Sequence, residues 1–364
     1  MKRKFSLNSL LQSNLTLTLI AILFAFVVGG VFLQCIGISP FVAYAKLLES
    51  AFSSPKSISY CIVYGTPLIF TGLSVAFSFR TGVFNIGAEG QFVVGSMAAC
   101  VIGILVPAPS IILIPMCFVA AAAAGALWGL IVGVLKTKWG INEVLSMIMF
   151  NWVAFYLSNY IVSIPAIHSE SAAEATRNVS DAARILLPEG IREALGLANT
   201  TNWGIILAGL FAIAIYLIIE KTTLGYELKA VGFNRHAAEY GGINVNRAML
   251  TALSISGALA GIGGAVQVLG MGQRISVFAG QEGYGFDGIV VALIGSSNPL
   301  GVVIAGLFYG ALKYAGSKLN LIGAPSEVIK IITGTVVFFI AISQIFKIIK
   351  KKKGREEANA KHRQ

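Results

Sequence analysis

The sequence predicts an all-α polytopic membrane protein. Of its 364 residues, 56% are hydrophobic and only 12% are charged, and the mean hydropathy is +0.80. Apolar stretches of about 20 residues, the length that crosses a bilayer as a helix, recur along almost the whole chain. Helices are expected because lipid cannot satisfy exposed backbone groups, and a barrel would show short alternating segments instead.

The apolar stretches predict about ten transmembrane helices. We place them near residues 15–36, 59–79, 89–106, 111–134, 142–164, 203–220, 248–270, 287–297, 300–316 and 325–349. The first follows a basic MKRK terminus, as in a signal peptide, but its apolar run is too long and no clean cleavage site follows, so we expect a retained span. A single transmembrane domain over residues 1–349 is therefore expected, followed by a basic tail, residues 350–364, that offers little to bury.

Lysine and arginine gather at the ends of these spans and indicate the topology. With the N-terminus in the cytoplasm, that side receives more Lys and Arg than the other, so both termini are expected to be cytoplasmic. The net charge of +11 does not indicate nucleic-acid binding, because the basic residues are not gathered on one folded soluble face. In this topology residues 221–247 form a cytoplasmic loop and residues 165–202 form the longest outer segment.

Two groups of small residues predict close helix packing. They are Ala121, Gly125, Gly129 and Gly133, spaced every four residues, and Gly257, Gly261, Gly263 and Gly264. Such positions let two helices approach closely. The second group shares letters with a dinucleotide-binding fingerprint, but no strand precedes it, so we interpret it as a packing surface.

Polar sequences interrupt the apolar pattern at three places, which predicts broken helices. Residues 80–92, RTGVFNIGAEGQF, and residues 274–288, RISVFAGQEGYGFDG, share Arg, Val-Phe and Glu-Gly in the same order. The spans before them run in opposite directions, so we expect two inverted repeat halves, about 59–164 and 248–349, with a transport site between them. The third break is GSSNPLG, residues 295–301, where Pro299 should open the next helix.

Ionisable and polar groups in these breaks are the candidates for a permeation path, because such groups are costly in a membrane and usually face its protein interior or water. The candidates are Phe84, Asn85, Glu89, Gln91, Phe92, Glu282 and Asp287. Asn85 is expected to cap a half-helix whose positive end favours Glu89. The alternative is that these side chains serve as packing and caps. For Glu143, beside Asn142 at a helix start, capping is favoured.

The cytoplasmic loop 221–247 carries helix signals of its own. Asn234 can cap a short turn, and the polar residues after it gather before Gly241 and Gly242. This pattern favours a docking site for a cytoplasmic partner, and the alternative is a solvated loop without one. The outer segment, residues 165–202, should hold short surface helices that either cover the span ends or receive an external partner.

Several chemical signatures are absent from the sequence. There is no GxxxxGK[ST] phosphate loop, so the chain has no ATP cradle of the usual kind, and any energy must come from elsewhere. HExxH and GxSxG are missing, and the three histidines have no ligand spacing. We therefore expect neither an enzyme nor a bound cofactor or metal.

Three stretches carry a resemblance to a known family. They are GYELKAVGFNRHAAEYGGINVNR with the following ALSISGALAGIGGA, TGVFNIGAEGQF, and GYGFDGIVVALIGSSNPLG. Together they resemble the permease subunits of ABC importers for branched-chain amino acids, ribose and nucleosides, most of all the nucleoside and simple-sugar branch. The likeness covers about residues 60–345.

This resemblance implies a permease in a bacterial cytoplasmic membrane with a ten-helix fold similar to that of the vitamin B12 importer. It implies a second, usually non-identical permease, an extracellular substrate-binding lipoprotein and a cytoplasmic ATP-binding subunit that uses the ATP and pushes on the loop 221–247. The coupling residues that it implies are Asn234, Arg235, His236, Glu239, Tyr240 and Gly241.

The expected function is therefore translocation of nucleosides as part of an ATP-driven importer. A permease for a simple sugar such as ribose or galactose has the same architecture and remains an alternative. A secondary transporter driven by ions or protons would also suit inverted repeats and buried carboxylates. A purely structural membrane scaffold would leave the polar breaks unexplained.

Overall fold

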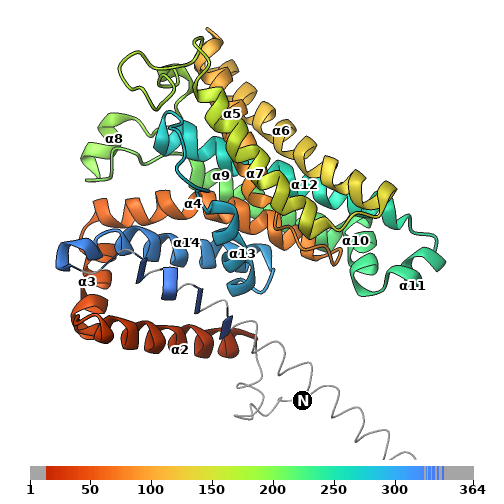
Figure 1. Cartoon of the computed structure of the whole chain (residues 1–364), viewed down its shortest axis with the longest axis horizontal. Coiled ribbons are helices and arrows are strands. Elements are labelled where there is room, and N and C mark those ends of the chain that lie inside the picture. Colours follow the sequence, from red (N-terminus) through yellow and green to blue (C-terminus); the bar gives the residue numbers. More distant parts are fainter. Residues whose placement is uncertain are drawn as a thin grey trace, which may run out of the picture. The chain divides into compact units, whose positions relative to one another are not determined.

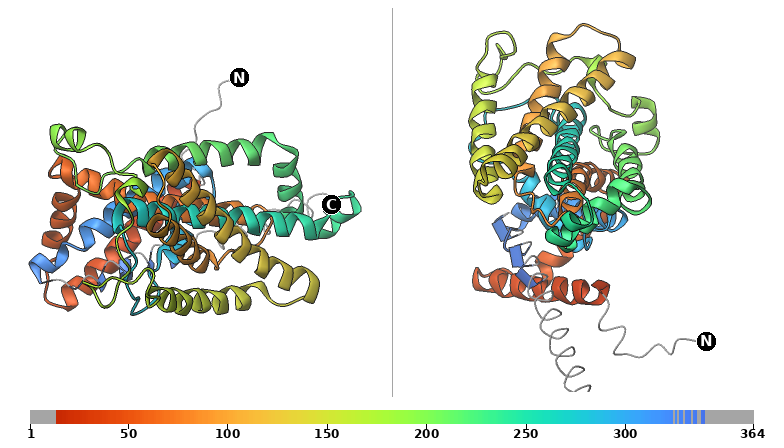
Figure 2. Two further views of the ribbon diagram at one scale, coloured as in Figure 1. Left: turned by 90° about the horizontal axis from the view of Figure 1, so that it is seen from above. Right: turned by 90° about the vertical axis from the view of Figure 1, so that its right-hand side faces the viewer.

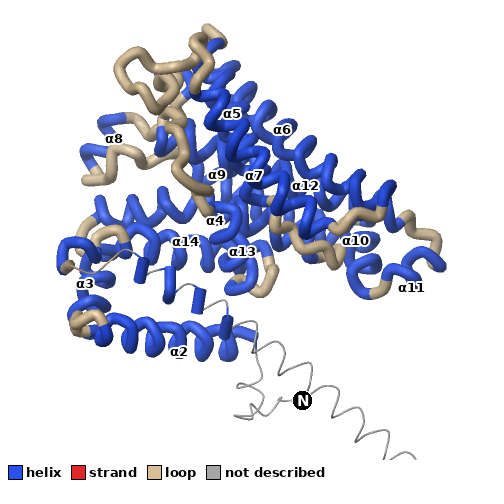
Figure 3. The backbone as a smooth tube through the Cα atoms, viewed as in Figure 1, coloured by secondary structure: helices blue, strands red, loops and turns tan. Residues whose placement is uncertain are grey.

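The computed structural model describes residues 14–323 and, beyond them, residues 325, 327–328, 330–332, 334–335 and 338–339. These residues form helices joined by loops (Figures 1 and 3). No β-strand occurs in this part of the chain, where pairing is limited to isolated bridges. The all-α prediction is therefore confirmed for the described residues.

Seven described helices are long and apolar enough to cross a membrane, fewer than the ten expected crossings. They are α4 (Pro55–Phe79), α5 (Ala88–Leu105), α6 (Ser110–Trp139), α7 (Glu143–Val162), α9 (Gly204–Lys221), α12 (Val245–Val266) with its π-helical extension η2 (Gln267–Gly272), and α14 (Pro299–Gly316). An eighth span exists if the bent pair α2 (Asn14–Cys35) and α3 (Pro40–Phe52) counts as one.

The difference from ten has three sources. Beyond residue 36 the chain bends by 118° into α3, a second helix that the apolar pattern did not predict. The predicted span 287–297 is α13 (Tyr284–Ile294), whose 11 residues extend only about 16 Å, too short to cross a bilayer of about 30 Å. The predicted span 325–349 lies largely outside the described residues.

The chain divides into a larger unit, residues 51–314, and a smaller one formed by residues 1–50 and 315–364. Within the larger unit, α12 packs against α4, α5 and α6 (Figure 2). α4 begins at Pro55 after the N-cap Ser54, whose side chain accepts a hydrogen bond from Ser57 N, and most of its length is buried. α4 and α12 thus form the core that positions the polar breaks.

The contact between α6 and α12 rests on glycine, as the small-residue spacing predicted. A Cβ atom at Gly125 would collide with the carbonyl oxygen of Gly257, and one at Gly257 would collide with that of Gly125. A Cβ atom at Gly261 would likewise meet the carbonyl oxygen of Ala121. Only glycine allows the two backbones to lie this close.

Side-chain caps begin α7, α11 (Arg235–Tyr240) and α14. Asn142 accepts hydrogen bonds from Val144 N (2.9 Å) and Leu145 N (3.2 Å) at the start of α7. Glu143, for which capping was favoured, is not the N-cap residue but lies in the first turn of α7 and pairs with Lys136 at the end of α6. Pro299 opens α14 as predicted, with Asn298 accepting from Leu300 N (3.0 Å). The third cap, Asn234, belongs to the loop described below.

The outer segment contains the short helices that were expected, η1 (Asp181–Ala183) and α8 (Glu189–Ala194). Backbone hydrogen bonds tie it to the ends of the membrane helices. Ser180 N donates to Gly103 O (2.9 Å) at the end of α5, and Ala198 N donates to Ser59 Oγ (2.8 Å) of α4. The segment therefore covers these span ends.

Candidate functional site

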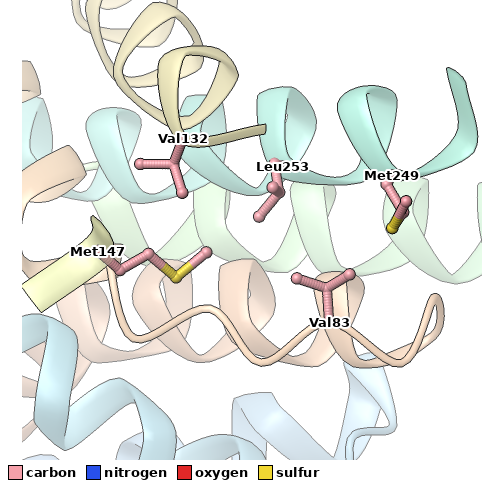
Figure 4. Close-up of a cluster of buried hydrophobic side chains, with 5 residues drawn as sticks. All are labelled: Val83, Val132, Met147, Met249 and Leu253. Carbon is pink, nitrogen blue, oxygen red and sulfur yellow. The ribbon is translucent and has the colours of Figure 1, made fainter. Parts of the chain in front are cut away.

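The first polar break is a tight turn between α4 and α5 held by an apolar anchor. Gly82 has a φ of +68°, which favours glycine. Val83 follows it and lies in a buried cluster with Val132 of α6, Met147 of α7, and Met249 and Leu253 of α12 (Figure 4). The anchor fixes where the next residues, 84–92, enter the bundle.

Asn85 is the centre of a buried polar network rather than the predicted helix cap. Its side chain is fully buried, and its Nδ2 lies 2.6 Å from Ser256 Oγ, 2.8 Å from Gln91 Oε1 and 3.2 Å from Ser74 Oγ. The network joins α4, α5 and α12. The capping prediction was wrong because this amide already has partners inside the bundle.

Backbone groups at the start of α5 form hydrogen bonds with a side chain of another helix, α7. Gly87 occupies the N-cap position and makes no side-chain cap. Instead, Asn151 of α7 accepts a hydrogen bond from Gly90 N (2.9 Å) and donates one to Ile86 O (3.1 Å). A side chain that is 61 residues away in the sequence therefore does the capping, which local spacing could not indicate.

Glu89 joins the first polar break to the second. Its side chain is 1% exposed, and its two oxygens accept hydrogen bonds from Gly283 N (2.7 Å) and Gly285 N (2.6 Å). These donors stand at the first turn of α13, and Glu89 itself lies in the first turn of α5. Both helix starts favour a negative group, so the carboxyl group connects two positive helix ends.

We expect Glu89→Leu to destabilise the chain strongly, because it leaves two N–H groups at the start of α13 without a partner. Each such group costs roughly 1–3 kcal/mol when buried. Thermal unfolding of the purified protein in detergent measures the loss. Glu282→Gln, an exposed neighbour, is the matched control and should unfold like the wild type. An unchanged midpoint for Glu89→Leu would contradict the assigned role.

Asp287 and Tyr284 of α13 form a second polar group with α14. Asp287 accepts hydrogen bonds from Tyr309 Oη (2.7 Å) and Lys313 Nζ (2.8 Å). The Lys313 ammonium also lies 3.8 Å from the centroid of the Tyr284 ring, and Phe92 stacks on that ring with centroids 5.0 Å apart. Of this group, only Asp287 was predicted as a candidate, and its partners on α14 were not. The four-residue spacing of Tyr309 and Lys313 was the available signal.

The seven candidate path residues differ in accessibility. Asn85, Glu89, Gln91 and Phe92 are buried and held by protein partners. Phe84 is half-buried with its ring 5.0 Å from that of Phe79, Asp287 is also half-buried, and Glu282 is exposed. Of the seven candidates, only Phe84, Glu282 and Asp287 have exposed side-chain surface that a solute could contact in this conformation. That all seven line a path remains a prediction.

The loop 221–247 forms a helical hairpin, α10 (Thr223–Phe233) and α11 (Arg235–Tyr240). As predicted, Asn234 caps the second helix, since its Oδ1 accepts a hydrogen bond from Ala237 N (3.1 Å). The hairpin joins α9 to α12 at the end of the larger unit opposite α8 (Figures 1 and 2). Of the α11 residues only Ala238 is buried.

Two aromatic side chains stand out on this hairpin. Tyr240 is 97% exposed and Phe233 is 90% exposed. The other predicted coupling residues, Asn234, Arg235, His236, Glu239 and Gly241, are exposed as well. Phe233 was not among the predicted coupling residues, although an aromatic residue next to a helix cap in a polar loop was a usable signal. Bare aromatic surface of this kind is typical of binding surfaces.

The hairpin also touches the first break directly. A Cβ atom at Gly232 of α10 would collide with the carbonyl oxygen of Arg80, and Gly82 lies beside it. The Arg80 guanidinium in turn donates from Nη2 to Ser297 O (3.0 Å) in the third break. The turn 80–82 therefore contacts both the hairpin and the loop 295–298 and connects the two.

Comparison with known proteins shows which protein family contains this chain. A family model described as branched-chain amino acid transport system / permease component matches residues 57–341. The chain belongs to this family. Membership in the permease family confirms the resemblance found in the sequence and identifies the chain as a multi-pass transport component rather than an enzyme.

Individual members of the permease family match over nearly the whole chain. The guanosine ABC transporter permease protein NupP of Bacillus subtilis is 38% identical over 95% of this chain and 99% of its own length. The nucleoside ABC transporter permease protein NupB of Lactococcus lactis is 32% identical over 91% and 92%. The glucose ABC transporter permease protein TsgB13 of Haloferax volcanii is 33% identical over 90% and 87%.

Proposed function

We propose that this chain is the permease subunit of an ATP-driven importer and forms the translocation path for nucleosides. The observation that carries the proposal is the likeness to the guanosine permease NupP, which extends over 95% of this chain. The likeness to the nucleoside permease NupB supports it. Since the sequence has no phosphate loop, ATP is bound and hydrolysed by a separate subunit, and this chain binds no cofactor.

The α10–α11 hairpin is the surface that the cytoplasmic ATP-binding subunit engages. Its exposed residues, from Phe233 to Gly241, would enter a groove on that subunit, with Phe233 and Tyr240 as aromatic anchors. The contact from Gly232 to Arg80 and on to Ser297 gives the motion a physical route from the hairpin to the polar breaks. A push on the hairpin would thereby change access to the path.

The proposed complex contains further subunits. A second, non-identical permease is supported by NupQ, another guanosine ABC transporter permease protein of Bacillus subtilis, which is 28% identical to this chain over 270 residues. An extracellular substrate-binding lipoprotein would deliver the solute to the side that carries the outer segment. In this arrangement both termini and the hairpin lie in the cytoplasm of a bacterial cell.

We further propose the ten-helix arrangement similar to the vitamin B12 importer, with inverted halves at about 59–164 and 248–349. The hydrogen bonds of Glu89 to Gly283 and Gly285 support it, because they bring the two matching breaks together. The path then runs beside these breaks. In this proposal the exposed or half-buried residues contact the solute in the path; they are Phe84, Glu282 and Asp287. The buried residues form the wall of the path; they are Asn85, Glu89, Gln91 and Phe92.

A simple-sugar permease is the second candidate, favoured by the 33% identity to the glucose permease TsgB13. Solute competition separates the two. The assembled transporter, with its lipoprotein, is reconstituted in vesicles, and ATP-driven uptake of labelled guanosine is measured with excess nucleosides or excess glucose, ribose and galactose. We expect nucleosides alone to compete. Uptake of a sugar with no uptake of any nucleoside would reject the nucleoside proposal.

A further inference from the structure

An apolar groove lies between α6 and α9, away from the polar breaks. Its volume is about 590 Å³, within the range of about 300–1,000 Å³ that is typical of small-molecule sites. Pro115 and Phe118 of α6 form one wall and Leu207 and Leu210 of α9 form the other, while α12 contributes the buried Ile262. At one end it meets Arg184 and Trp203.

The groove opens on a surface that suits lipid rather than water. Exposed apolar residues recur along α9 every three or four positions, which places them on one face. They are Trp203, Ile206, Leu210, Ile213 and Leu217. α6 carries similar exposed residues, among them Ile112 and Val119, and both helices are among the least buried spans.

Arg184 provides a cationic group with unused hydrogen-bonding capacity at this groove. Its Nη1 lies 2.7 Å from Asp181 Oδ1, but its Nε is buried and has no partner. An unpaired buried donor is costly, so a ligand that accepts from it gains binding energy. The Asp181 side chain is 89% exposed, and an ion pair so close to water is weak. A phosphate can bond Nε and a second N–H together.

The position along the helix also fits. Trp203 precedes the first turn of α9, at the end remote from the α10–α11 hairpin. Trp is enriched where membrane spans meet the headgroups, and the long side chain of an Arg near a span end can reach them. From Trp203 to Phe211 the groove extends about 12 Å along α9. That length is close to one leaflet, about 15 Å.

We propose that this groove binds an anionic phospholipid, with one acyl chain along α9 and the phosphate on Arg184. The site is separate from the solute path and requires no particular solute. It would anchor the outer ends of α6 and α9, together with the segment around residues 181–186, to the bilayer.

Native mass spectrometry of the purified, assembled transporter tests the site. Phosphatidylglycerol or phosphatidylcholine with the same acyl chains is added after delipidation, and the bound fraction is measured. The wild type should bind phosphatidylglycerol about tenfold more tightly, the effect of a charged hydrogen-bonded contact. Arg184→Gln should remove this preference, whereas Arg177→Gln, in the same outer segment but outside the groove, should keep it.

Two further variants separate a ligand site from a structural ion pair. Asp181→Asn breaks the same pair as Arg184→Gln but frees the guanidinium, so it should strengthen phosphatidylglycerol binding. A loss of binding in both variants would assign Arg184 a structural role and overturn the proposal. Leu207→Trp fills the groove and should weaken both lipids, while Ile213→Trp, on the exposed face of the same helix beyond the groove, should leave them unchanged.

The main competing occupant is another protein subunit. If Leu207→Trp prevents assembly with the second permease and Ile213→Trp does not, the groove is a protein interface and the lipid proposal fails. Equal binding of the two lipids by the wild type would also overturn it, because the Arg184 contact would then have no effect.

Discussion

Replacement of Phe233 and Tyr240 together by aspartate should abolish ATP-driven uptake while the chain still folds and inserts. Both side chains are at least 90% exposed, so their loss removes no packing within the permease. If they are the anchors for the ATP-binding subunit, an anchor of this kind contributes about 2 kcal/mol or more to binding. The affinity for that subunit should then fall at least about 30-fold.

Co-purification of the ATP-binding subunit and uptake by reconstituted vesicles measure this effect. The matched control replaces Ile191 and Leu195 by aspartate. These are exposed apolar residues of α8 and its C-cap, at the opposite end of the unit, and the change should leave subunit binding intact. Unchanged uptake in the Phe233 and Tyr240 variant would show that the ATP-binding subunit contacts the permease elsewhere.

The second large effect is expected from Gly257→Leu, which should prevent stable folding. Its Cβ would lie 2.8 Å from the Gly125 carbonyl carbon and 3.3 Å from the Ala126 Cα, and backbone atoms inside two packed helices cannot move aside. Overpacking usually costs about 1–3 kcal/mol, and a backbone collision exceeds that range. Because whole proteins are stable by only about 5–15 kcal/mol, much of the folded population should be lost.

Gly209→Leu is the control for this substitution. Gly209 lies in α9, and no atom beyond its chain neighbours and the nearby backbone of its own helix lies within 4 Å of a Cβ built there. Leucine also has a higher helix propensity than glycine, so this variant should keep the wild-type midpoint of thermal unfolding in detergent, or exceed it. A wild-type midpoint for Gly257→Leu would show that the two backbones do not pack as closely as described.

Local spacing was enough to predict the features that depend on neighbouring residues. The four-residue repeat of Ala121, Gly125 and Gly129 predicted which face of α6 packs closely against another helix. Helix periodicity alone decides which residues share a face. Asn234 was identified as a cap, and the helix start at residues 142–143 was recognised although the cap is Asn142 rather than Glu143, because a cap acts two or three residues along the chain. The all-helical class followed from composition.

Features that depend on distant partners could not be predicted in this way. Asn85 was interpreted as a cap. No neighbouring residue indicates that its side-chain amide donates a hydrogen bond to Ser256, 171 residues later. Glu89 was identified as a buried polar group, but not its partners Gly283 and Gly285. Apolar composition also cannot separate a spanning helix from a short buried one, and α13 was therefore predicted to cross the membrane. Burial by protein and burial by lipid favour the same residues.

The most direct test of the account is a comparison of energy sources in reconstituted vesicles. We predict that guanosine enters only when this chain is assembled with its partner permease, the ATP-binding subunit and the lipoprotein, and only with ATP. This chain alone should take up none under an imposed proton or sodium gradient. Gradient-driven uptake by the chain alone would contradict the account and identify a secondary transporter.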